Sequence, residues 1–266
     1  MRIIIIYVQV PLWTIDEING VKMLIPIECL DKVWRVHPKS ILHVGAHLGE
    51  ESDSYIKMGW GSEDPTVWIE AQHELAETLR NKLSNKDDVV LEAVAWNQSD
   101  IELEFNIANN TQSSSIFKLG THGVDYPEIE FTEKVKVKTI RLDELLPKEF
   151  KFDFINLDIQ GAELQALKGL GNKLNSVDWI YSEVNAKEVY EGCSRIEDLD
   201  QYLLSKDFKR VCTKWAGSAG WGDALYINTR NVKLRWLTAR ALTTFSWIFL
   251  SRVIRKLKRM SKVFSH

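Results

Sequence analysis

The chain has 266 residues, 45% of them hydrophobic, which is enough to bury the core of one α/β domain with extensions. Its three cysteines form no CxxC pair and are odd in number, which argues against a disulfide framework and favours a reducing compartment. The net charge of −3 conceals an asymmetry, because residues 231–266 carry nine Lys or Arg and no acid, leaving 25 basic and 37 acidic side chains, or −12, on the first 230. Such an acidic globule repels phosphates, so nucleic acid is not an expected partner.

Residues 1–39 are predicted to form an N-terminal extension. The opening run MRIIIIYVQVP has one basic residue and no small-residue cleavage site, so it favours a strand over a secretory signal. A loop is expected around residues 11–20 and a helix near 28–36, which Pro38 ends.

Short apolar runs alternate with helical patterns along the rest of the chain. Strands are predicted at residues 41–44, 66–70, 89–95, 152–157, 179–183, 209–213 and 222–228, and helices up to 58 and at 73–83, 143–146, 162–169 and 197–204. The continuous apolar runs of the first and third strands predict a parallel sheet that is buried on both faces.

The alternation is interrupted by two segments of a different kind. Residues 101–107 and 134–140 alternate polar and apolar side chains, as half-exposed antiparallel strands do. The polar stretch between them, residues 109–130, has little periodicity, and such long loops are usually functional or disordered.

The first candidate site follows the strand at residues 41–44. Gly45 and Gly49 bracket a tight turn, and Glu70 ends the next strand, where a carboxylate can accept both hydroxyls of a ribose. The spacing is GxxxG and not the GxGxxG of a pyrophosphate-binding turn, so an adenosine without phosphates fits better than NAD. The alternatives are a strand–helix turn without a ligand and a solvated loop acid.

The second candidate site follows the strand at residues 152–157. In the run NLDIQGAE, Asp158 lies just past the strand, at the edge where side chains reach the ligand crevice of an open sheet. The alternative role for Asp158 is to cap the next helix, with Glu163 completing the arrangement. Glu183 and Asn185 end the next strand on the same side, and nothing in the spacing of these oxygen ligands demands a metal ion.

Together these segments resemble the FkbM family of S-adenosylmethionine-dependent methyltransferases over roughly residues 40–228. The resemblance implies a class I methyltransferase fold: a doubly wound, mostly parallel sheet of seven strands with helices on both faces and an antiparallel last strand. It implies that Glu70 binds the ribose and that the cofactor site is formed by Gly45, Ala46, His47, Gly49, Glu70, Ala71, Ala93, Val94 and Asp158. Family members commonly carry Glu where this chain has Gln160, so one charge is missing here.

The resemblance also extends into the long loop. The family has a serine-rich stretch and a later HxxxYP-like stretch, which here are matched by Ser113, Ser114, Ser115, His122, Tyr126 and Pro127. We therefore expect this loop, with Asn185, to form the wall of an acceptor-substrate site, with Asp158, His122 and Glu183 as catalytic residues. A histidine has a pKa near neutrality and is a suitable base, and the alternative is a flexible surface loop.

The basic tail, residues 231–266, is predicted to contain an amphipathic helix. Between Phe249 and Met260 apolar residues share one helical face and basic residues another, which suits an anionic membrane surface. The uncharged run 241–251 is shorter than the roughly 20 residues that span a bilayer. The alternative is a helix that docks on a second subunit.

We therefore predict an O-methyltransferase domain at residues 40–230 that acts on a sugar hydroxyl of a glycan, polysaccharide or glycolipid. S-adenosylmethionine would be its cofactor and the cytoplasm, at the face of the membrane, its location. Two other classes stay open: an NAD-dependent sugar oxidoreductase, and a non-catalytic membrane scaffold that kept the fold.

Overall fold

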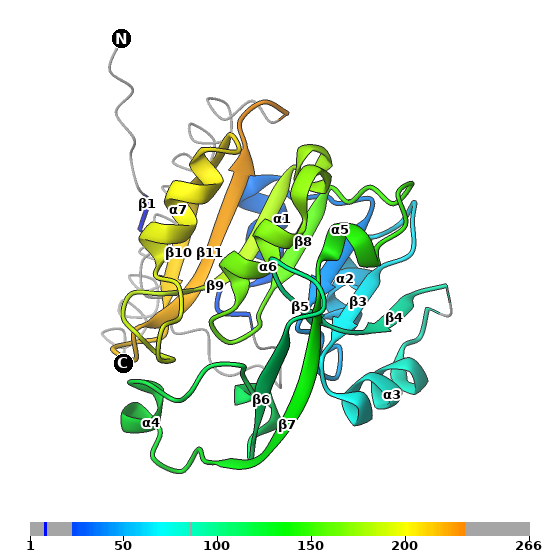
Figure 1. Cartoon of the computed structure of the whole chain (residues 1–266). Helices are drawn as coiled ribbons and strands as arrows, with labels where there is room; N and C mark the ends of the chain where they lie inside the picture. The colour runs from blue at the N-terminus through cyan, green and yellow to red at the C-terminus, as the bar shows by residue number, and fades with distance from the viewer. Residues whose placement is uncertain (1–7, 10–22, 86, 232–266) are drawn as a thin grey trace, which may run out of the picture.

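The structure, a computed structural model, describes residues 8–9, 23–85 and 87–231. A main sheet has the strand order β1-β10-β11-β9-β8-β2-β3-β4 (Figure 1). Its strands are β1 (Val8–Gln9), β2 (Ile41–Val44), β3 (Val67–Glu70), β4 (Val89–Glu92), β8 (Phe154–Leu157), β9 (Trp179–Asn185), β10 (Phe208–Trp215) and β11 (Trp221–Asn228). The described helices are α1 (Ile27–Trp34), α2 (Ser52–Met58), α3 (His73–Lys82), α4 (His122–Asp125), α5 (Leu142–Leu145), α6 (Glu163–Gly169) and α7 (Ile196–Leu204).

The strand directions confirm the predicted doubly wound sheet. Strands β4, β3, β2, β8 and β9 are parallel to one another, and β11 is antiparallel to both β9 and β10. These seven strands are the predicted ones, with the last in sequence antiparallel. The two-residue β1 adds an eighth strand, which pairs in parallel with β10.

Helices cover both faces of the sheet because its central strands are apolar on both sides. On one face α5, α6 and α7 pack against Val44, Ile155 and Ile180, and Figure 1 shows α6 and α7 in front of the sheet. On the other face α1, α2 and α3 pack against a cluster that includes Trp68 and Phe154. Burying apolar surface contributes about 25 cal/mol per Å², and this stabilises the packing of the helices on the sheet.

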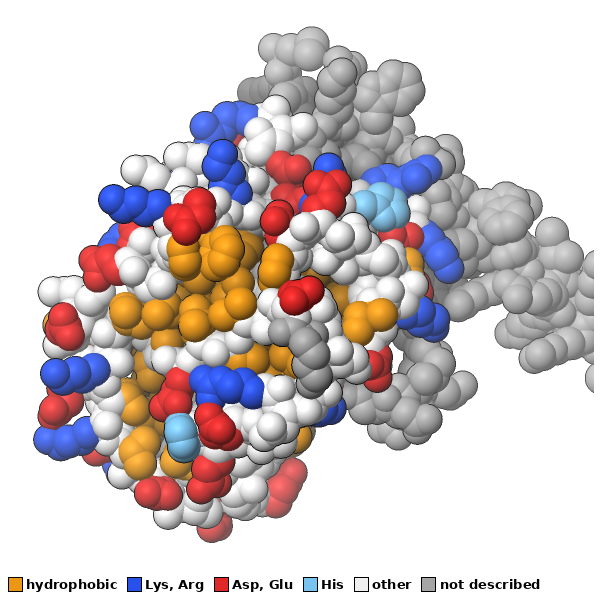
Figure 2. Space-filling model, turned by 90° about the vertical axis from the view of Figure 1, so that its right-hand side faces the viewer, with side chains coloured by type: hydrophobic (Ala, Val, Ile, Leu, Met, Phe, Trp, Pro, Cys, Tyr) orange, Lys and Arg blue, Asp and Glu red, His pale blue; other side chains and the backbone are white. Residues whose placement is uncertain are grey.

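The predicted strand at residues 89–95 is wrong in two respects. The strand is interrupted at Ala93, whose N–H donates to Glu70 O (3.0 Å). As a result β4 stays in the main sheet, while β5 (Val94–Ala95) pairs with β7 (Phe131–Ile140) in a separate sheet. In addition, β4 is an edge strand and its side chains are half-buried or exposed. Figure 2 looks onto this side of the molecule and shows hydrophobic side chains gathered in the middle of the face.

The alternating segments form the predicted antiparallel pair, β6 (Glu102–Ala108) with β7. Between them the long loop is ordered by its own short helices, η1 (Thr111–Ser113) and α4, and by backbone hydrogen bonds to the chain after β9. The N–H groups of Gly120 and His122 both donate to Val189 O (3.0 Å each). The loop is therefore attached next to the carboxyl ends of β8 and β9.

Two predictions lie outside the described residues: the loop at residues 11–20 and the amphipathic helix of the tail. In the part of the chain that the structure describes, no helix is long and apolar enough to cross a bilayer.

Candidate functional site

Two cavities meet at the carboxyl edge of the parallel strands, where open α/β sheets bind ligands. The first has an empty volume of about 620 Å³, including its open mouth, and lies over the ends of β2, β3 and β5. The second has about 1230 Å³ measured in the same way and lies under the long loop, between β8, β9 and β11. Gln112, Asp158 and Gln160 line both cavities, so one ligand in each would meet at these side chains.

The two sequence motifs form turns that pack directly on each other. Gly45 has φ +85°, and its N–H and that of Ala46 both donate to Ile69 O (2.9 Å each). A Cβ on Gly45 would lie 1.8 Å from Asp158 O, so only glycine fits at this contact. Asp158 N in turn donates to Val44 O (3.0 Å), which places the Asp158 side chain at the mouth of the first turn.

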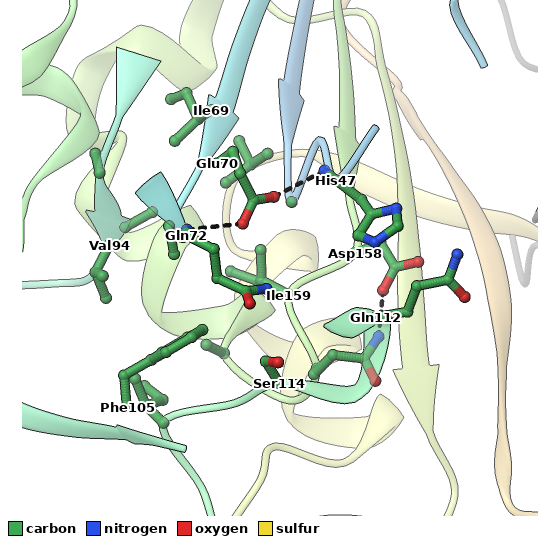
Figure 3. Close-up of a pocket in the computed structure, with 18 of the residues that line it drawn as sticks. His47, Ile69, Glu70, Gln72, Val94, Phe105, Gln112, Ser114, Asp158 and Ile159 are labelled. Atoms are coloured by element: carbon green, nitrogen blue, oxygen red, sulfur yellow. Dashed lines mark hydrogen bonds between the residues drawn. The ribbon is translucent and has the colours of Figure 1, made fainter. Parts of the chain in front are cut away.

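Glu70 connects the end of β3 to the first turn. Its two carboxylate oxygens accept the N–H of His47 (2.7 Å) and the N–H of Gln72 (2.9 Å), as the dashed lines in Figure 3 show. Burial raises the pKa of Glu70, and these backbone hydrogen bonds oppose the shift. Each oxygen keeps a second lone pair, so the carboxylate can still accept two hydroxyl groups from a ligand in the first cavity.

The first part of the long loop lies across this turn. The ring of His47 bonds to Glu50 through Nδ1 (2.6 Å) and to Thr111 Oγ1 through Nε2 (2.9 Å), while Gln72 donates to Thr111 O (3.1 Å). Gln112 lies next to this contact and forms part of the wall of each cavity. The segment around η1 thus separates the two cavities except at their junction.

The second turn brings two carboxylates together through an amide. Gln160 donates from Nε2 to Asp158 Oδ1 (2.5 Å) and to Glu183 Oε2 (3.1 Å), and its Oε1 accepts the hydroxyl of Tyr190 (2.7 Å). Asp158 does not cap α6, whose first-turn N–H groups receive no side-chain cap from the preceding residue. The Asp158 side chain instead lines both cavities at their junction.

The buried side chain of Glu163 stabilises the same turn by hydrogen bonds to its backbone. Its Oε1 accepts the N–H groups of Ile159 (3.0 Å) and Gly161 (3.1 Å), and the side chain is only 1% exposed. Burial raises its pKa to about 7, the backbone hydrogen bonds oppose this, and the charge of Asp158 adds to it. Asp158 and Glu163 therefore do not cap the helix together, as the sequence had suggested. Glu163 accepts the N–H groups of the turn, and Asp158 lines the two cavities.

Aromatic side chains surround His122 in the second cavity. The ring of His122 stacks on Tyr190 (5.4 Å between centroids) and lies beside Tyr126 (4.8 Å). Its Nε2 is 3.4 Å from Ser113 Oγ, and its Nδ1 has no hydrogen-bond partner among the described residues. Burial lowers the pKa of His122, which the charges of Asp125 and Glu128 oppose, so the neutral ring is favoured. Trp221, on β11, completes this wall and donates to Tyr126 Oη (3.4 Å).

The structure distributes the predicted residues between the two cavities. The first cavity is lined by Gly45, His47, Glu70, Ala71, Ala93, Val94, Ser114 and Asp158. The second is lined by Ser113, His122, Tyr126, Asp158 and Glu183.

Five predicted residues have other positions. Ser114, expected at the acceptor site, lines the first cavity, and Ser115 lines neither, because its hydroxyl donates to Gln160 O (2.8 Å) inside the protein. Gly49 packs its turn on α3, since a Cβ there would lie 2.6 Å from Leu79 Cδ1. Asn185 is 1% exposed and lines neither cavity. Ala46 lies behind the turn, in a smaller cavity with Asp158 and Glu183.

Several lining residues were missed in the sequence. Gln112 lies within the serine-rich stretch and could have been found there. Phe105, Trp221 and Asp223 lie on strands whose sequence does not indicate which face meets a cavity. Tyr190, which lines neither cavity but donates to Gln160, carries no local signal either. Among the described residues, no group of three or more His, Cys, Asp or Glu is arranged to hold a metal ion.

Comparisons with known proteins point to one family. The sequence profile of the family described as "Methyltransferase FkbM domain" matches residues 43–210. The chain is 25% identical, over 199 residues, to the 2-O-methyltransferase NoeI of Sinorhizobium fredii (strain NBRC 101917 / NGR234). The matched region covers 71% of this chain and 79% of that protein.

The solved structures that match the chain have lower sequence identity to it. The methyltransferase FkbM of Methylobacillus flagellatus KT matches at a TM-score of 0.47 and 20% identity, covering 71% of this chain, and this chain spans only 43% of that protein. The magnesium protoporphyrin IX methyltransferase of Synechocystis PCC 6803, solved with bound SAM, matches at a TM-score of 0.38 and 9% identity, covering 71% of this chain and 69% of that one.

Proposed function

Because the chain belongs to the FkbM methyltransferase family, we propose that it transfers the methyl group of S-adenosylmethionine to a hydroxyl oxygen of a sugar in a glycan, polysaccharide or glycolipid. The observation that carries this proposal is the junction of the two cavities at Gln112, Asp158 and Gln160. A methyl transfer needs two ligands that meet at one point, and a site for a single ligand does not need a second cavity.

The first cavity fits the cofactor. Glu70 stands at the tip of β3 with lone pairs available for the ribose hydroxyls, and the apolar Ala93, Val94 and Phe105 offer flat surfaces for the adenine. The turn between Gly45 and Gly49 has the GxxxG spacing and not the GxGxxG of a pyrophosphate-binding turn, which supports S-adenosylmethionine over NAD.

The second cavity fits a sugar. Its described lining combines two aromatic side chains, Tyr126 and Trp221, with polar groups that hydrogen-bond hydroxyls, such as Asn109, Glu128 and Asp223. The matched 2-O-methyltransferase agrees with transfer to oxygen.

Catalysis then depends mainly on orientation. The cofactor supplies an already activated methyl group, so the protein must align the acceptor oxygen with it and remove the hydroxyl proton. Asp158 lies at the junction, and His122 presents a neutral ring from the second cavity. We assign the role of proton acceptor to Asp158 or His122, with Glu183 as the neighbouring carboxylate.

A paired substitution tests the cofactor site. Glu70 and Glu92 end adjacent strands in register, but only Glu70 lines the first cavity. In calorimetry with S-adenosylhomocysteine, Glu70→Ala is expected to weaken binding by about 1.5–3 kcal/mol, the range of hydrogen bonds to charged groups, while Glu92→Ala is expected to bind as the wild type does. Equal affinity of both folded variants would refute the assignment.

The acceptor is tested by transfer of radiolabelled methyl groups to a panel of neutral sugars, oligosaccharides and glycolipids. Labelled product that is alkali-stable and contains an O-methyl sugar supports the proposal. Binding of NAD in place of S-adenosylhomocysteine would favour the oxidoreductase.

A further inference from the structure

We propose that Gln160 is a positioning residue: its side-chain amide holds Asp158 and Glu183 as two separate carboxylates that share no proton, at the place where the cavities meet. The proposal depends on the function proposed above only for its effect on rate. The arrangement of the three side chains stands on the hydrogen bonds alone.

Gln160 is fixed more firmly than a surface glutamine. It has φ +54°, a left-handed conformation that is rare for a residue with a Cβ, and its side chain is 8% exposed. Its backbone oxygen accepts the hydroxyl of Ser115 (2.8 Å). Such a conformation costs about 1–3 kcal/mol and persists only when its surroundings determine it, which is usual at functional sites.

The hydrogen bond from Tyr190 indicates the orientation of the Gln160 side-chain amide. Burial raises the pKa of Tyr190 far above its usual value, and the charges of Glu183 and Asp158 add to this, so its hydroxyl keeps its proton. The hydroxyl has one proton and two acceptors in reach, Gln160 Oε1 (2.7 Å) and Ser113 O (3.3 Å). The shorter contact takes the proton, which places the amide oxygen at that end. The amide nitrogen must then face the carboxylates, which it does (2.5 and 3.1 Å).

The amide nitrogen has two N–H groups, one for each carboxylate. Two acids this close would otherwise tend to hold one proton between them, since like charges oppose the second ionisation. With Gln160 between them each acid receives a hydrogen bond that favours its charged form. Both carboxylates are then limited to accepting hydrogen bonds, which suits the removal or orientation of hydroxyl protons.

Other titratable groups lie around this network. A small cavity beside Asp158 and Glu183 is also lined by His43, His47, Glu50, Glu51 and Tyr181. Glu163 lies on α6, His122 on α4 and Asp223 on β11, and Tyr190 and Cys193 follow β9. Since Asp158, Glu183, Glu163 and Asp223 are all carboxyl groups, an additional carboxyl at position 160 would hold its proton to a higher pH than an ordinary glutamate.

The first arm of the test measures thermal unfolding of the full-length protein without ligand. Gln160→Glu is compared with Gln201→Glu, the same change on the exposed surface of α7, each at pH 5 and pH 8. A glutamate with a raised folded-state pKa contributes stability that is lost as the pH rises. Hence the unfolding temperature of Gln160→Glu should lie further below that of the wild type at pH 8 than at pH 5. The additional difference should be roughly 3–5 °C for each unit by which the pKa of the new glutamate is raised. Gln201→Glu should show no such widening. A difference that does not change with pH would overturn the proposal.

The second arm uses a sugar that the wild type methylates. Gln160→Glu is expected to move the acidic limb of the kcat profile up by about one pH unit or more, and a limb at the wild-type position would overturn the positioning role. If this variant fails to fold at either pH, Gln160→Met, of similar length and without donors, is measured instead. We expect it to lower kcat at least tenfold with KM for S-adenosylmethionine changed less than threefold, and an unchanged kcat would count against the proposal. If no sugar is methylated by the wild type, the proposed function fails, while the thermal arm still decides the role of Gln160.

Discussion

Replacing Glu163 by glutamine is expected to stabilise this protein at alkaline pH and not at acidic pH. One oxygen, Oε1, accepts both backbone hydrogen bonds that this side chain makes to the second turn, from Ile159 and Gly161. An amide oxygen in the same place can accept both. The substitution therefore keeps the turn and removes only the ionisation of a buried acid.

The magnitude follows from the pKa. Burial raises the pKa of Glu163 from 4.5 to about 7 in the folded state. Because the folded value lies above the unfolded one, the favourable contribution is fully present below about pH 4.5 and is lost as the pH rises to about 7. At 1.36 kcal/mol for each pKa unit, the wild type loses roughly 3 kcal/mol over this interval. We expect Glu163→Gln to recover about 1–3 kcal/mol of it at pH 8, since the new amide N–H needs an acceptor.

Urea denaturation at pH 5 and pH 8, without ligand, measures the effect. Glu74→Gln is the matched control, because Glu74 also lies in the first turn of its helix but is exposed. The free energies of unfolding of Glu163→Gln and the wild type should agree within about 1 kcal/mol at pH 5 and separate at pH 8. A variant that is less stable than the wild type by the same amount at both pH values would refute the reasoning, because it would show that Glu163 is ionised at little cost.

Three further outcomes are expected. Gly45→Ala should lower the free energy of unfolding by several kcal/mol in urea titrations, because its Cβ would meet Asp158 O at 1.8 Å in a left-handed conformation; a stable variant would show that the two turns are not in contact. His122→Ala should reduce kcat about 10²-fold at saturating acceptor but leave the affinity for S-adenosylhomocysteine unchanged, since His122 lines only the second cavity; a normal rate would move the base to Asp158, Glu183 or His47. Deleting residues 232–266 removes nine basic side chains, each contributing about 1 kcal/mol near an anionic surface, and should abolish sedimentation with anionic liposomes. If the full chain ignores such liposomes, the deletion should instead change the oligomer seen by light scattering.

Much of the fold could be read from the sequence because its signals are local. Apolar runs such as residues 41–44 and 154–157 are buried wherever the neighbouring strands lie, and alternation in residues 102–108 already indicates one exposed face. The interruption at Ala93 could not be read, because the residues from Val89 to Ala95 are all apolar except Glu92 and only the partners of each half, β3 and β7, separate them.

For the site, the sequence by itself determined the two turns: Gly45 and Asp158 follow strands whose carboxyl ends must lie at one edge of a parallel sheet. It could not determine which loop residues face which cavity. Ser113, Ser114 and Ser115 are adjacent and chemically identical, yet they line the second cavity, the first cavity and neither. Only the tertiary structure decided this, and also the contacts of Gln160 with Glu183 and Tyr190, because these hydrogen bonds join residues 23 and 30 positions apart and form only after the strands and the long loop have packed.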